Sequence, residues 1–430
     1  MNEWKNKILG ELGFTYAGLS GKTIKDFGKG KPFIPYMNIF TNSKIDTTFI
    51  NYVQVHPSEK QNVVKNGDLF FTTSSETIEE VGMTSVLLEE VGECYLNSFC
   101  FGFRLYNNED LLPEFAPYLF RGNVVRKRIS DLGQGSTRYN LPKTELLKKL
   151  ELNLPPLTSQ RQIAKILSTA DAVIEKTQAA IDKYKAIKKG MLQDLFTRGI
   201  DITTGKLRPK YEEAPELYKE SKLGWIPNEW DVKPLEDITD YVDYRGKTPP
   251  KSDFGIYLVT ARNIKNGIID YEISKEYIRE DSYESAMSRG KVKLGDVLIT
   301  TEAPMGNVAQ IDKEDIALAQ RVIKYRGFEC KLNNDFLSKF LMSENFQRQL
   351  SAESTGSTVL GIKGSRLHKL IIVVPEFDEQ VIIAERIKTV DKKIEFEQNY
   401  SLKFQKIKSG LMSDLLSGKK RVVVKEEEVA

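Results

Sequence analysis

Two stretches of the chain, residues 155–197 and 375–417, contain a row of positions at alternating steps of four and three that is apolar at its ends and more polar near its middle. In the first stretch these positions are Ile163, Leu167, Ala170, Ile174, Thr177, Ile181, Tyr184, Lys188, Met191 and Leu195. In the second they are Ile383, Ile387, Val390, Ile394, Glu397, Ser401, Phe404, Lys408, Leu411 and Leu415. This spacing predicts two long helices, each with the seam of a coiled coil.

The two stretches also align with each other without a gap. Gln160 pairs with Gln380, and Asp171 pairs with Asp391. A self-match of this length indicates an internal duplication. Aligned glycines, Gly190 and Gly410, interrupt both helices at a cost of about 1 kcal/mol each relative to alanine. Their recurrence predicts a bend or a close approach of another helix at this point.

Residues 1–154 and 222–374 have the mixed pattern of globular α/β units. Apolar runs bounded by glycine and asparagine predict strands at residues 64–73 and 99–106. Between residues 111 and 132 the apolar positions recur at three and four, which predicts a helix.

The two globular units correspond at short anchors. VKNGDLFFTT at residues 64–73 matches VKLGDVLITT at 292–301, and a GST triplet occurs at 135–137 and again at 356–358. Because the anchors agree while the surrounding loops differ, we expect one scaffold with two different reading surfaces. The predicted order is residues 1–154 as the first unit, 155–198 as a helix, 199–221 as a linker, 222–374 as the second unit, 375–418 as a helix and 419–430 as a charged tail.

The composition is that of a folded protein and leaves the partner open. The chain has 430 residues, 40% of them hydrophobic, which favours two or three domains. Its 63 Lys and Arg residues against 60 Asp and Glu residues give a net charge of +3, which neither demands nor excludes DNA. The three cysteines fit no metal-ligand spacing, so we expect small buried thiols in a reducing cytoplasm. With no long apolar run, we also expect no membrane association.

Motifs for catalysis are not found. GLSGKT at residues 18–23 resembles the end of a phosphate-binding loop, but Tyr16 stands where that loop needs glycine. His56 and His368 are the only histidines, and they are far apart in the sequence, which disfavours metal and triad chemistry. We therefore expect a noncatalytic binding protein without a metal or cofactor of its own.

Several polar and basic groups are candidates for contacts with nucleic acid. A basic helical segment supplies Arg121, Arg126, Lys127 and Arg128. The loop around the first GST triplet supplies Gln134, Ser136, Thr137, Arg138, Tyr139 and Asn140, and its counterpart supplies Ser357, Thr358, Lys363 and Arg366. Further candidates in the second unit are Arg262, Gln320, Arg321, Lys324 and Arg326. Strand ends after the repeated Gly-Asp turn add Thr72, Thr73, Ser74, Thr300 and Thr301. The alternative for each residue is an ordinary solvated helix face or surface loop.

Nearly the whole chain resembles the specificity (S) subunit of type I restriction-modification systems. The resemblance rests on the sequences LPPLTSQRQIAKILSTADAVIEKTQ, MLQDLFTRGI, TTGKLRP, LGWIPNEWDVKPLEDI, VKLGDVLITT and VVPEFDEQ. It implies an α+β fold with a pseudo-twofold internal repeat. Two similar α/β target-recognition domains are separated by two long helices that pair as an antiparallel coiled coil.

The resemblance also implies partners. Each domain would read one half of a bipartite site on double-stranded DNA. Two methylation subunits would carry S-adenosylmethionine, and restriction subunits would use ATP with Mg. If the two seams pack on each other, apolar residues beside them remain for partner helices, namely Ile166, Val173, Ile187 and Ile407. The competing interpretation is a coiled-coil scaffold or adaptor without nucleic-acid recognition.

Overall fold

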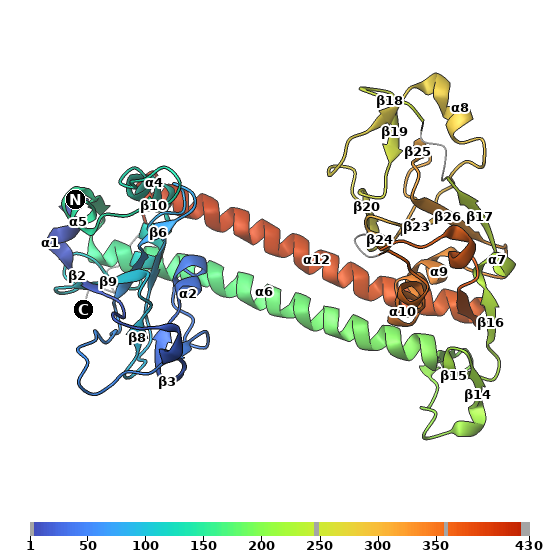
Figure 1. Ribbon diagram of the computed structural model, residues 1–430, viewed down its shortest axis with the longest axis horizontal. Coiled ribbons are helices and arrows are strands. Elements are labelled where there is room, and N and C mark those ends of the chain that lie inside the picture. The colour runs from blue at the N-terminus through green and yellow to red at the C-terminus, as the bar shows by residue number, and fades with distance from the viewer. Residues whose placement is uncertain (1–3, 245–248, 357–359, 423–430) are drawn as a thin grey trace. The chain divides into compact units, whose positions relative to one another are not determined.

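The computed structural model describes residues 4–244, 249–356 and 360–422. The chain forms two compact units (Figure 1). Unit 1 contains residues 1–178 and 399–430, and unit 2 contains residues 179–398. Each unit therefore consists of one globular part and one half of each long helix.

The two long helices are α6 (Leu157–Thr197) and α12 (Phe377–Leu416). In unit 1, Ile163 and Leu167 of α6 share a core with Leu415 of α12. In unit 2, Leu195 of α6 shares a core with Ile383 of α12. Early residues of one helix thus meet late residues of the other, and the pair is antiparallel. Every predicted seam position is buried or half-buried, which confirms the seam.

The repeated glycines do not mark a close approach of helices. A Cβ atom built on Gly190 or Gly410 would have no neighbour within 4 Å in the described structure. Both residues are exposed on uninterrupted helices. The prediction of close packing at these glycines is therefore wrong.

Both globular parts contain the same four-stranded antiparallel sheet. In unit 1 the strand order is β2 (Gly13–Ala17), β9 (Cys100–Leu105), β5 (Leu69–Thr72) and β7 (Thr84–Val86). In unit 2 it is β17 (Thr239–Asp243), β26 (Val322–Gly327), β23 (Val297–Thr301) and β24 (Met305–Gln310). The strands predicted at residues 64–73 and 99–106 are confirmed as β5 and β9. The matching Gly-Asp sequences lead into the equivalent strands β5 and β23.

A two-stranded antiparallel ribbon precedes each long helix. β1 (Lys5–Ile8) pairs with β11 (Glu151–Leu154), and β16 (Asp231–Pro234) pairs with β27 (Ile371–Val374). The first strand of each ribbon leads into a short helix, α1 (Leu9–Leu12) or α7 (Leu235–Ile238). The duplication therefore includes the junction between each globular part and its helix.

The second sheet differs between the units. Unit 1 has three strands in the order β4 (Asn51–Val53), β3 (Phe27–Ile34) and β8 (Tyr95–Leu96). Unit 2 has four in the order β18 (Lys251–Ser252), β22 (Tyr277–Ile278), β19 (Ile256–Val259) and β25 (Ile316–Leu318). A shared sheet thus carries two different additions, as the divergent loop sequences predicted.

The helix predicted at residues 111–132 is divided in two. Gly122 is extended, with φ −69° and ψ 143°, and separates α3 (Ala116–Arg121) from α4 (Asn123–Ser130). Unit 2 has a corresponding pair, α9 (Asn334–Leu341) and α10 (Glu344–Ala352). The remaining helices are α2 (Tyr36–Thr41), α5 (Lys143–Lys149), α8 (Tyr283–Ala286) and α11 (Gly364–Leu367), with 3-10 turns at Ile24–Asp26, Pro215–Leu217 and Glu280–Ser282. The remaining strands are β6 (Ser74–Ser75), β10 (Tyr139–Asn140), β20 (Ile264–Lys265) and β21 (Ile268–Ile269).

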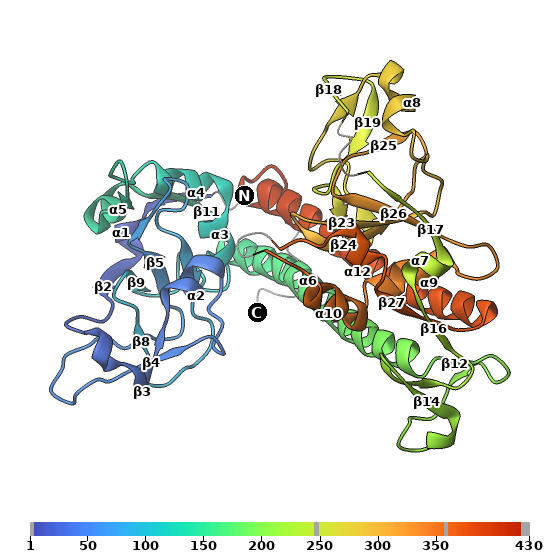
Figure 2. The same cartoon turned by 45° about the vertical axis from the view of Figure 1, so that its right-hand side comes forward.

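The connection after α6 is folded against unit 2, although its sequence predicted a simple linker. β12 (Ile200–Asp201) pairs with β13 (Lys206–Leu207), and β14 (Tyr218–Ser221) pairs with β15 (Gly224–Pro227), at the end of α6 (Figure 2). Glu379, at the start of α12, is 2% exposed and accepts hydrogen bonds from Arg208, Trp230 and the backbone N–H of Ile200. This carboxylate attaches the connection to the helix.

Two of the three cysteines are buried, as expected, but Cys330 is exposed. No helix in the described ranges is both long enough and apolar enough to cross a bilayer. Within the same ranges, no group of three or more His, Cys, Asp or Glu residues is arranged to hold a metal ion.

Candidate nucleic-acid interface

The repeated Gly-Asp turn is fixed by a buried ion pair in unit 1. Asp68 is 1% exposed, and its carboxylate accepts two hydrogen bonds from Arg104 of β9, each of 2.7 Å. It also accepts from the hydroxyl of Tyr16 at 2.5 Å and from the backbone N–H of Lys65 at 2.8 Å. Asp68 therefore joins β2, β5 and β9.

Unit 2 has the same arrangement around Asp296. Arg326 of β26 donates two hydrogen bonds of 2.6 Å to this carboxylate, which is fully buried. Lys324, 1% exposed, lies 3.8 Å away, and Lys293 donates its backbone N–H at 2.8 Å. Burial lowers the pKa of Lys324, and the charge of Asp296 opposes that shift. Lys324 and Arg326 thus hold the sheet together, which argues against their predicted contact with DNA.

In unit 1 the structure brings two groups of predicted site residues together. β10 pairs with β6, so that Asn140 lies opposite Ser74. Gln134 and Asn140 form an antiparallel β-bridge, which joins the two ends of the loop of residues 134–140. Arg138 donates from Nε to Ser74 Oγ at 3.1 Å, and Leu141 donates its backbone N–H to the Thr73 carbonyl at 2.8 Å. The loop of residues 133–141 therefore lies beside the end of β5, where we expected recognition residues.

The same junction occurs in unit 2 with different side chains. Ile362 donates its backbone N–H to the Thr301 carbonyl at 3.0 Å. Gly361 forms isolated antiparallel β-bridges with Glu302 and with Thr355. Arg321, at a positive φ of 73°, lies 3.7 Å from the Glu302 carboxylate. The loop that carries Lys363 thus follows the end of β23 as residues 133–141 follow the end of β5.

Two arginines of the basic helical segment have structural roles. Arg121 donates to the carbonyls of four residues, which are Thr84, Ile39, Phe40 and Asn42. Arg126 donates to the carbonyls of Gly82, Glu79 and Val81. Burial lowers the pKa of each guanidinium to about 10, and for Arg121 the charge of Arg126 adds to the effect. Their donors are used within the fold, which argues against the predicted phosphate contacts.

The predicted strand-end threonines are also used internally. Thr72 and Thr300 are fully buried. The Thr72 hydroxyl accepts from the backbone N–H of Met83 at 2.9 Å, and the Thr300 hydroxyl accepts from that of Asn307 at 3.0 Å. Thr301 is only 3% exposed. The Thr72 and Thr300 hydroxyls hold the neighbouring segment, and the burial of all three threonines argues against direct contact with a large ligand.

The other predicted residues are more accessible. Those classed as exposed are Lys127, Arg128, Gln134, Ser136, Thr137, Arg138, Asn140, Arg262, Gln320, Arg321, Lys363 and Arg366. Thr73 and Tyr139 are half-buried, and Ser74 is buried. Arg128 donates to the Glu151 carbonyl, and Arg366 lies 3.7 Å from the Glu353 carboxylate. Ser357 and Thr358 lie outside the described residues.

Aligned glutamines attach each long helix to its globular part. Gln160 is fully buried, accepts from the backbone N–H of Leu112 at 2.9 Å, and donates to the carbonyls of Asp110 and Pro155. In unit 2, Gln380 is also fully buried and bonds in the same way to the backbones of Asn333, Lys331 and Pro375. The sequence alignment paired these glutamines without indicating this role.

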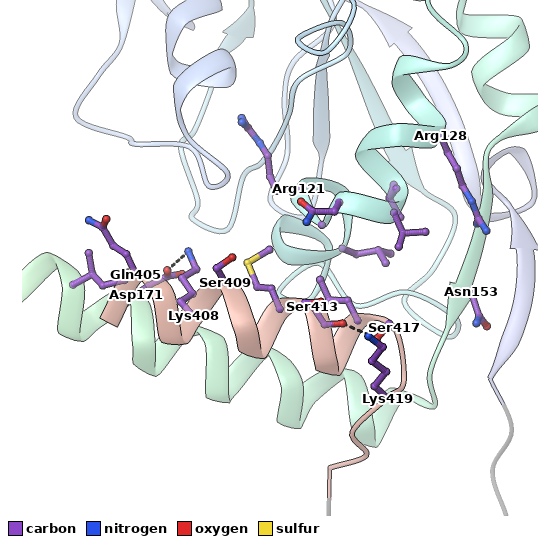
Figure 3. Close-up of a pocket in the computed structure, with 18 of the residues that line it drawn as sticks. Arg121, Arg128, Asn153, Asp171, Gln405, Lys408, Ser409, Ser413, Ser417 and Lys419 are labelled. Atoms are coloured by element: carbon purple, nitrogen blue, oxygen red, sulfur yellow. Dashed lines mark hydrogen bonds and ion pairs between the residues drawn. The ribbon is translucent and has the colours of Figure 1, made fainter. Parts of the chain in front are cut away.

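Aligned aspartates connect the two helices. In unit 1, Asp171 of α6 pairs with Lys408 of α12 beside a groove of about 850 Å³ (Figure 3). In unit 2, Asp391 of α12 pairs with Lys188 of α6 at 2.5 Å and with Lys339 at 2.7 Å. The heptad spacing placed both helix lysines in the seam but did not predict these ion pairs. The signal was present, because each Asp and each Lys aligns with its equivalent in the other helix.

The Asp171 contact predicts a stability effect in acid. Burial alone would raise the pKa of this carboxyl, but hydrogen bonds from Lys408 and Tyr118 and the nearby lysine charges together lower it. Because the folded pKa is depressed, the contact stabilises the fold above about pH 4 and is lost as the pH falls through the folded value. We expect the difference in unfolding free energy between wild type and Asp171→Asn to shrink below about pH 4. Urea titrations at several pH values measure it, and a difference that persists in acid would contradict the assignment.

The apolar residues predicted to bind partners flank the seam. Ile166, Ile187 and Ile407 are 37%, 44% and 41% exposed, and Val173 is half-buried. Phe396 and Leu402 on α12 are more exposed still, at 65% and 55%, although the heptad count did not single them out. The helix pair therefore presents apolar side chains outside its own seam.

The repeated sheet, loop junction and helix attachment define a duplicated two-domain α+β protein with paired long helices. A family model described as the type I restriction modification DNA specificity domain matches residues 1–183 and 227–403. The chain therefore belongs to the family of type I restriction-modification DNA specificity subunits.

Relatives with similar sequences carry the same description. The type I restriction enzyme MjaVIII specificity subunit of Methanocaldococcus jannaschii is 31% identical over 288 residues, which cover 65% of this chain and 64% of the relative. The putative MjaX specificity subunit of the same organism is 26% identical over 94% of this chain and 90% of its own length. The EcoKI specificity subunit of Escherichia coli K12 is 22% identical and covers 83% and 74%.

Solved structures show the same fold. The crystal structure of a type I restriction-modification S subunit from M. genitalium has a TM-score of 0.55 at 13% identity and covers 96% of both chains. A structure from work on complex assembly and conformational transition of the type I system also has a TM-score of 0.55, at 15% identity, and covers 97% of this chain and 98% of the other.

Proposed function

We propose that this chain is the noncatalytic specificity subunit of a type I restriction-modification complex. Each globular part reads one half of a bipartite site on double-stranded DNA. The single observation that carries this proposal is the repeated junction between loop and strand. The same backbone arrangement presents Arg138 and Asn140 in unit 1 and Arg321 and Lys363 in unit 2.

This division of a common scaffold suits a two-part reader. Arginine, lysine and asparagine side chains can donate to base edges or to phosphates. Because the loops differ while the sheet is shared, each unit can select its own sequence. The near-neutral charge of +3 fits a chain that obtains part of its phosphate affinity from other subunits.

The paired helices supply the spacing and the docking surface in this proposal. Two half-sites on one face of DNA lie about 34 Å apart, or a multiple of that, so the readers need a separator of fixed length. A helix of 41 residues such as α6 is about 60 Å long at 1.5 Å per residue. Exposed Ile166, Ile187 and Ile407, together with Val173, offer apolar contacts to helices of two methyltransferase subunits. Those partners would bind S-adenosylmethionine, and restriction subunits would use ATP with Mg.

Exchanging residues 1–154 for the corresponding domain of another specificity subunit tests this function. The hybrid, expressed with its methyltransferase partner in cells, is expected to methylate sites with one half of the sequence changed and the other half retained. Sequencing that detects methylated bases measures the result. The reciprocal exchange of residues 222–374 should change the other half. If both exchanges leave the methylated sequence unchanged, the chain is a scaffold and the proposal fails.

A further inference from the structure

In unit 1 one carboxylate joins the globular part to both long helices. Asp171 of α6 accepts a hydrogen bond from the Tyr118 hydroxyl of α3 at 2.7 Å and pairs with Lys408 of α12. Lys44, from the segment after α2, lies 3.4 Å from Asp171 and 2.9 Å from the Tyr118 hydroxyl. The Asp171 side chain is 16% exposed, so these partners replace most of its water. Three separate elements therefore meet at this carboxylate.

Unit 2 repeats this joint with the two helices exchanged. The carboxylate is now Asp391 of α12, the lysine of the other helix is Lys188 of α6, and the globular part supplies Lys339 of α9. The distances are 2.5 Å to Lys188 and 2.7 Å to Lys339, and the Asp391 side chain is 27% exposed. Hydrogen bonds and charges from the lysines together outweigh burial and lower the pKa of this carboxyl, as they do for Asp171.

The groups from the two globular parts come from equivalent positions but differ in chemistry. Tyr118 follows the fully buried Phe115 by three residues, and Lys339 follows the fully buried Phe336 by three residues. In unit 1 the Tyr118 hydroxyl and the nearby Lys44 connect the globular part to the helix carboxylate, and in unit 2 the Lys339 ammonium makes this connection. The two globular parts contact equivalent carboxylates, Asp171 and Asp391, with different residues, which indicates that the contact itself matters and not the identity of one side chain.

We infer that these two joints fix the angle at which each recognition domain stands on its helices, so that Asp171 and Asp391 are positioning residues for the spacing of the half-sites. A partly buried carboxylate with several donors has one favourable geometry, because moving any element leaves a charge or a hydroxyl unpaired. Helix length alone would not hold that angle. The inference rests on the proposed function and names a second determinant of the recognised site, besides the length of the helices.

Lys339→Met and Tyr118→Phe test the inference in the full-length chain complexed with its methyltransferase partner. Tyr118→Phe keeps the buried ring, so it retains the packing of the helix and removes only the hydroxyl. Methylation is measured on duplexes that carry both half-sites with spacers one base pair shorter than, equal to and one base pair longer than the preferred length. Lys339→Met is expected to reduce the preference for the native spacer by about tenfold, as expected for loss of a partly buried charged contact. Tyr118→Phe is expected to reduce the preference less, because Lys44 remains 3.4 Å from Asp171.

Matched controls separate positioning from general stability. Glu175 and Glu395, aligned exposed carboxylates one turn after the two aspartates, provide Glu175→Gln and Glu395→Gln, which should keep the wild-type preference. Lys339→Arg retains the cation, so this variant should keep most of the preference for the native spacer that Lys339→Met loses. If Lys339→Met and Tyr118→Phe lower methylation equally on every spacer, the residues are only structural and the inference is overturned. A wild-type complex without any spacer preference would instead overturn the proposed function.

Discussion

Replacing Glu379 with alanine is expected to lower the free energy of unfolding by about 3–5 kcal/mol, the cost of breaking a buried ion pair. The carboxylate is 2% exposed and takes two hydrogen bonds from Arg208, of 2.6 and 3.0 Å. Its removal also leaves the Trp230 indole N–H and the Ile200 backbone N–H without their acceptor. The substitution therefore leaves two N–H donors without an acceptor and removes the carboxylate that pairs with the Arg208 charge.

Gly199 increases the dependence on this carboxylate. The residue has a φ of +64°, and a Cβ there would lie 2.1 Å from Glu379 Oε1 and 2.3 Å from the Trp230 ring. The chain leaving α6 is thus packed directly on the carboxylate, with no room for a substitute side chain.

Urea titration followed by tryptophan fluorescence measures the Glu379→Ala effect, because Trp230 reports on the site itself. Asp378→Asn is the matched control, since Asp378 is the adjacent carboxylate and lies outside this ion pair. We expect that control to change stability by less than about 0.5 kcal/mol. A loss below about 1 kcal/mol for Glu379→Ala would show that the connection after α6 does not depend on this site.

Replacing Asp296 with alanine is expected to destabilise the chain by a similar amount, about 3–5 kcal/mol. Arg326 would lose both hydrogen bonds to this carboxylate, and Lys324, 1% exposed, would lose the carboxylate charge that most offsets its burial. Adding Lys324→Met to Asp296→Ala should recover part of the loss, because methionine fills similar space without a buried charge.

The single, double and matched substitutions are compared by their midpoints in denaturant. Asp68→Ala in unit 1 should be less damaging, because Arg104 also donates to the Val63 carbonyl at 3.0 Å and has no buried lysine beside it. Equal losses for Asp68→Ala and Asp296→Ala, or no recovery in the double variant, would contradict this explanation.

Much of the fold could be predicted from the sequence because its main elements repeat. The seam of α6 and α12 extends over many heptads, and the Gly-Asp turn occurs before β5 and again before β23. Periodicity of this kind reports burial directly. The break at Gly122 was missed because apolar spacing continues across it. The folded connection after α6 was missed because the partner of Arg208 lies on α12, far away in the sequence.

The candidate site was harder to predict because a charged side chain does not reveal its partner. Arg121 and Arg126 lie among cations in the sequence, yet carbonyls of distant segments surround them. In the sequence Arg326 and Arg321 look alike, since both are arginines in the same short basic segment. In the structure Arg326 donates to the buried Asp296 carboxylate at 2.6 Å, whereas Arg321 lies 3.7 Å from the half-buried Glu302 carboxylate. In contrast, Ser74 and Arg138 were both predicted as site residues, and in the structure Arg138 Nε donates to Ser74 Oγ at 3.1 Å. Their contact with DNA stays a prediction.

The glutamine at the start of each long helix has a consequence for how such proteins diversify. Among the residues that the structure describes, Gln160 and Gln380 each form hydrogen bonds with main-chain N–H and carbonyl groups only. Main-chain groups are present whatever the side chains are, so substitutions in the globular part leave these hydrogen-bond partners in place. A reading module acquired by recombination can therefore keep this contact through its backbone alone, whereas the joints at Asp171 and Asp391 also need a matching side chain.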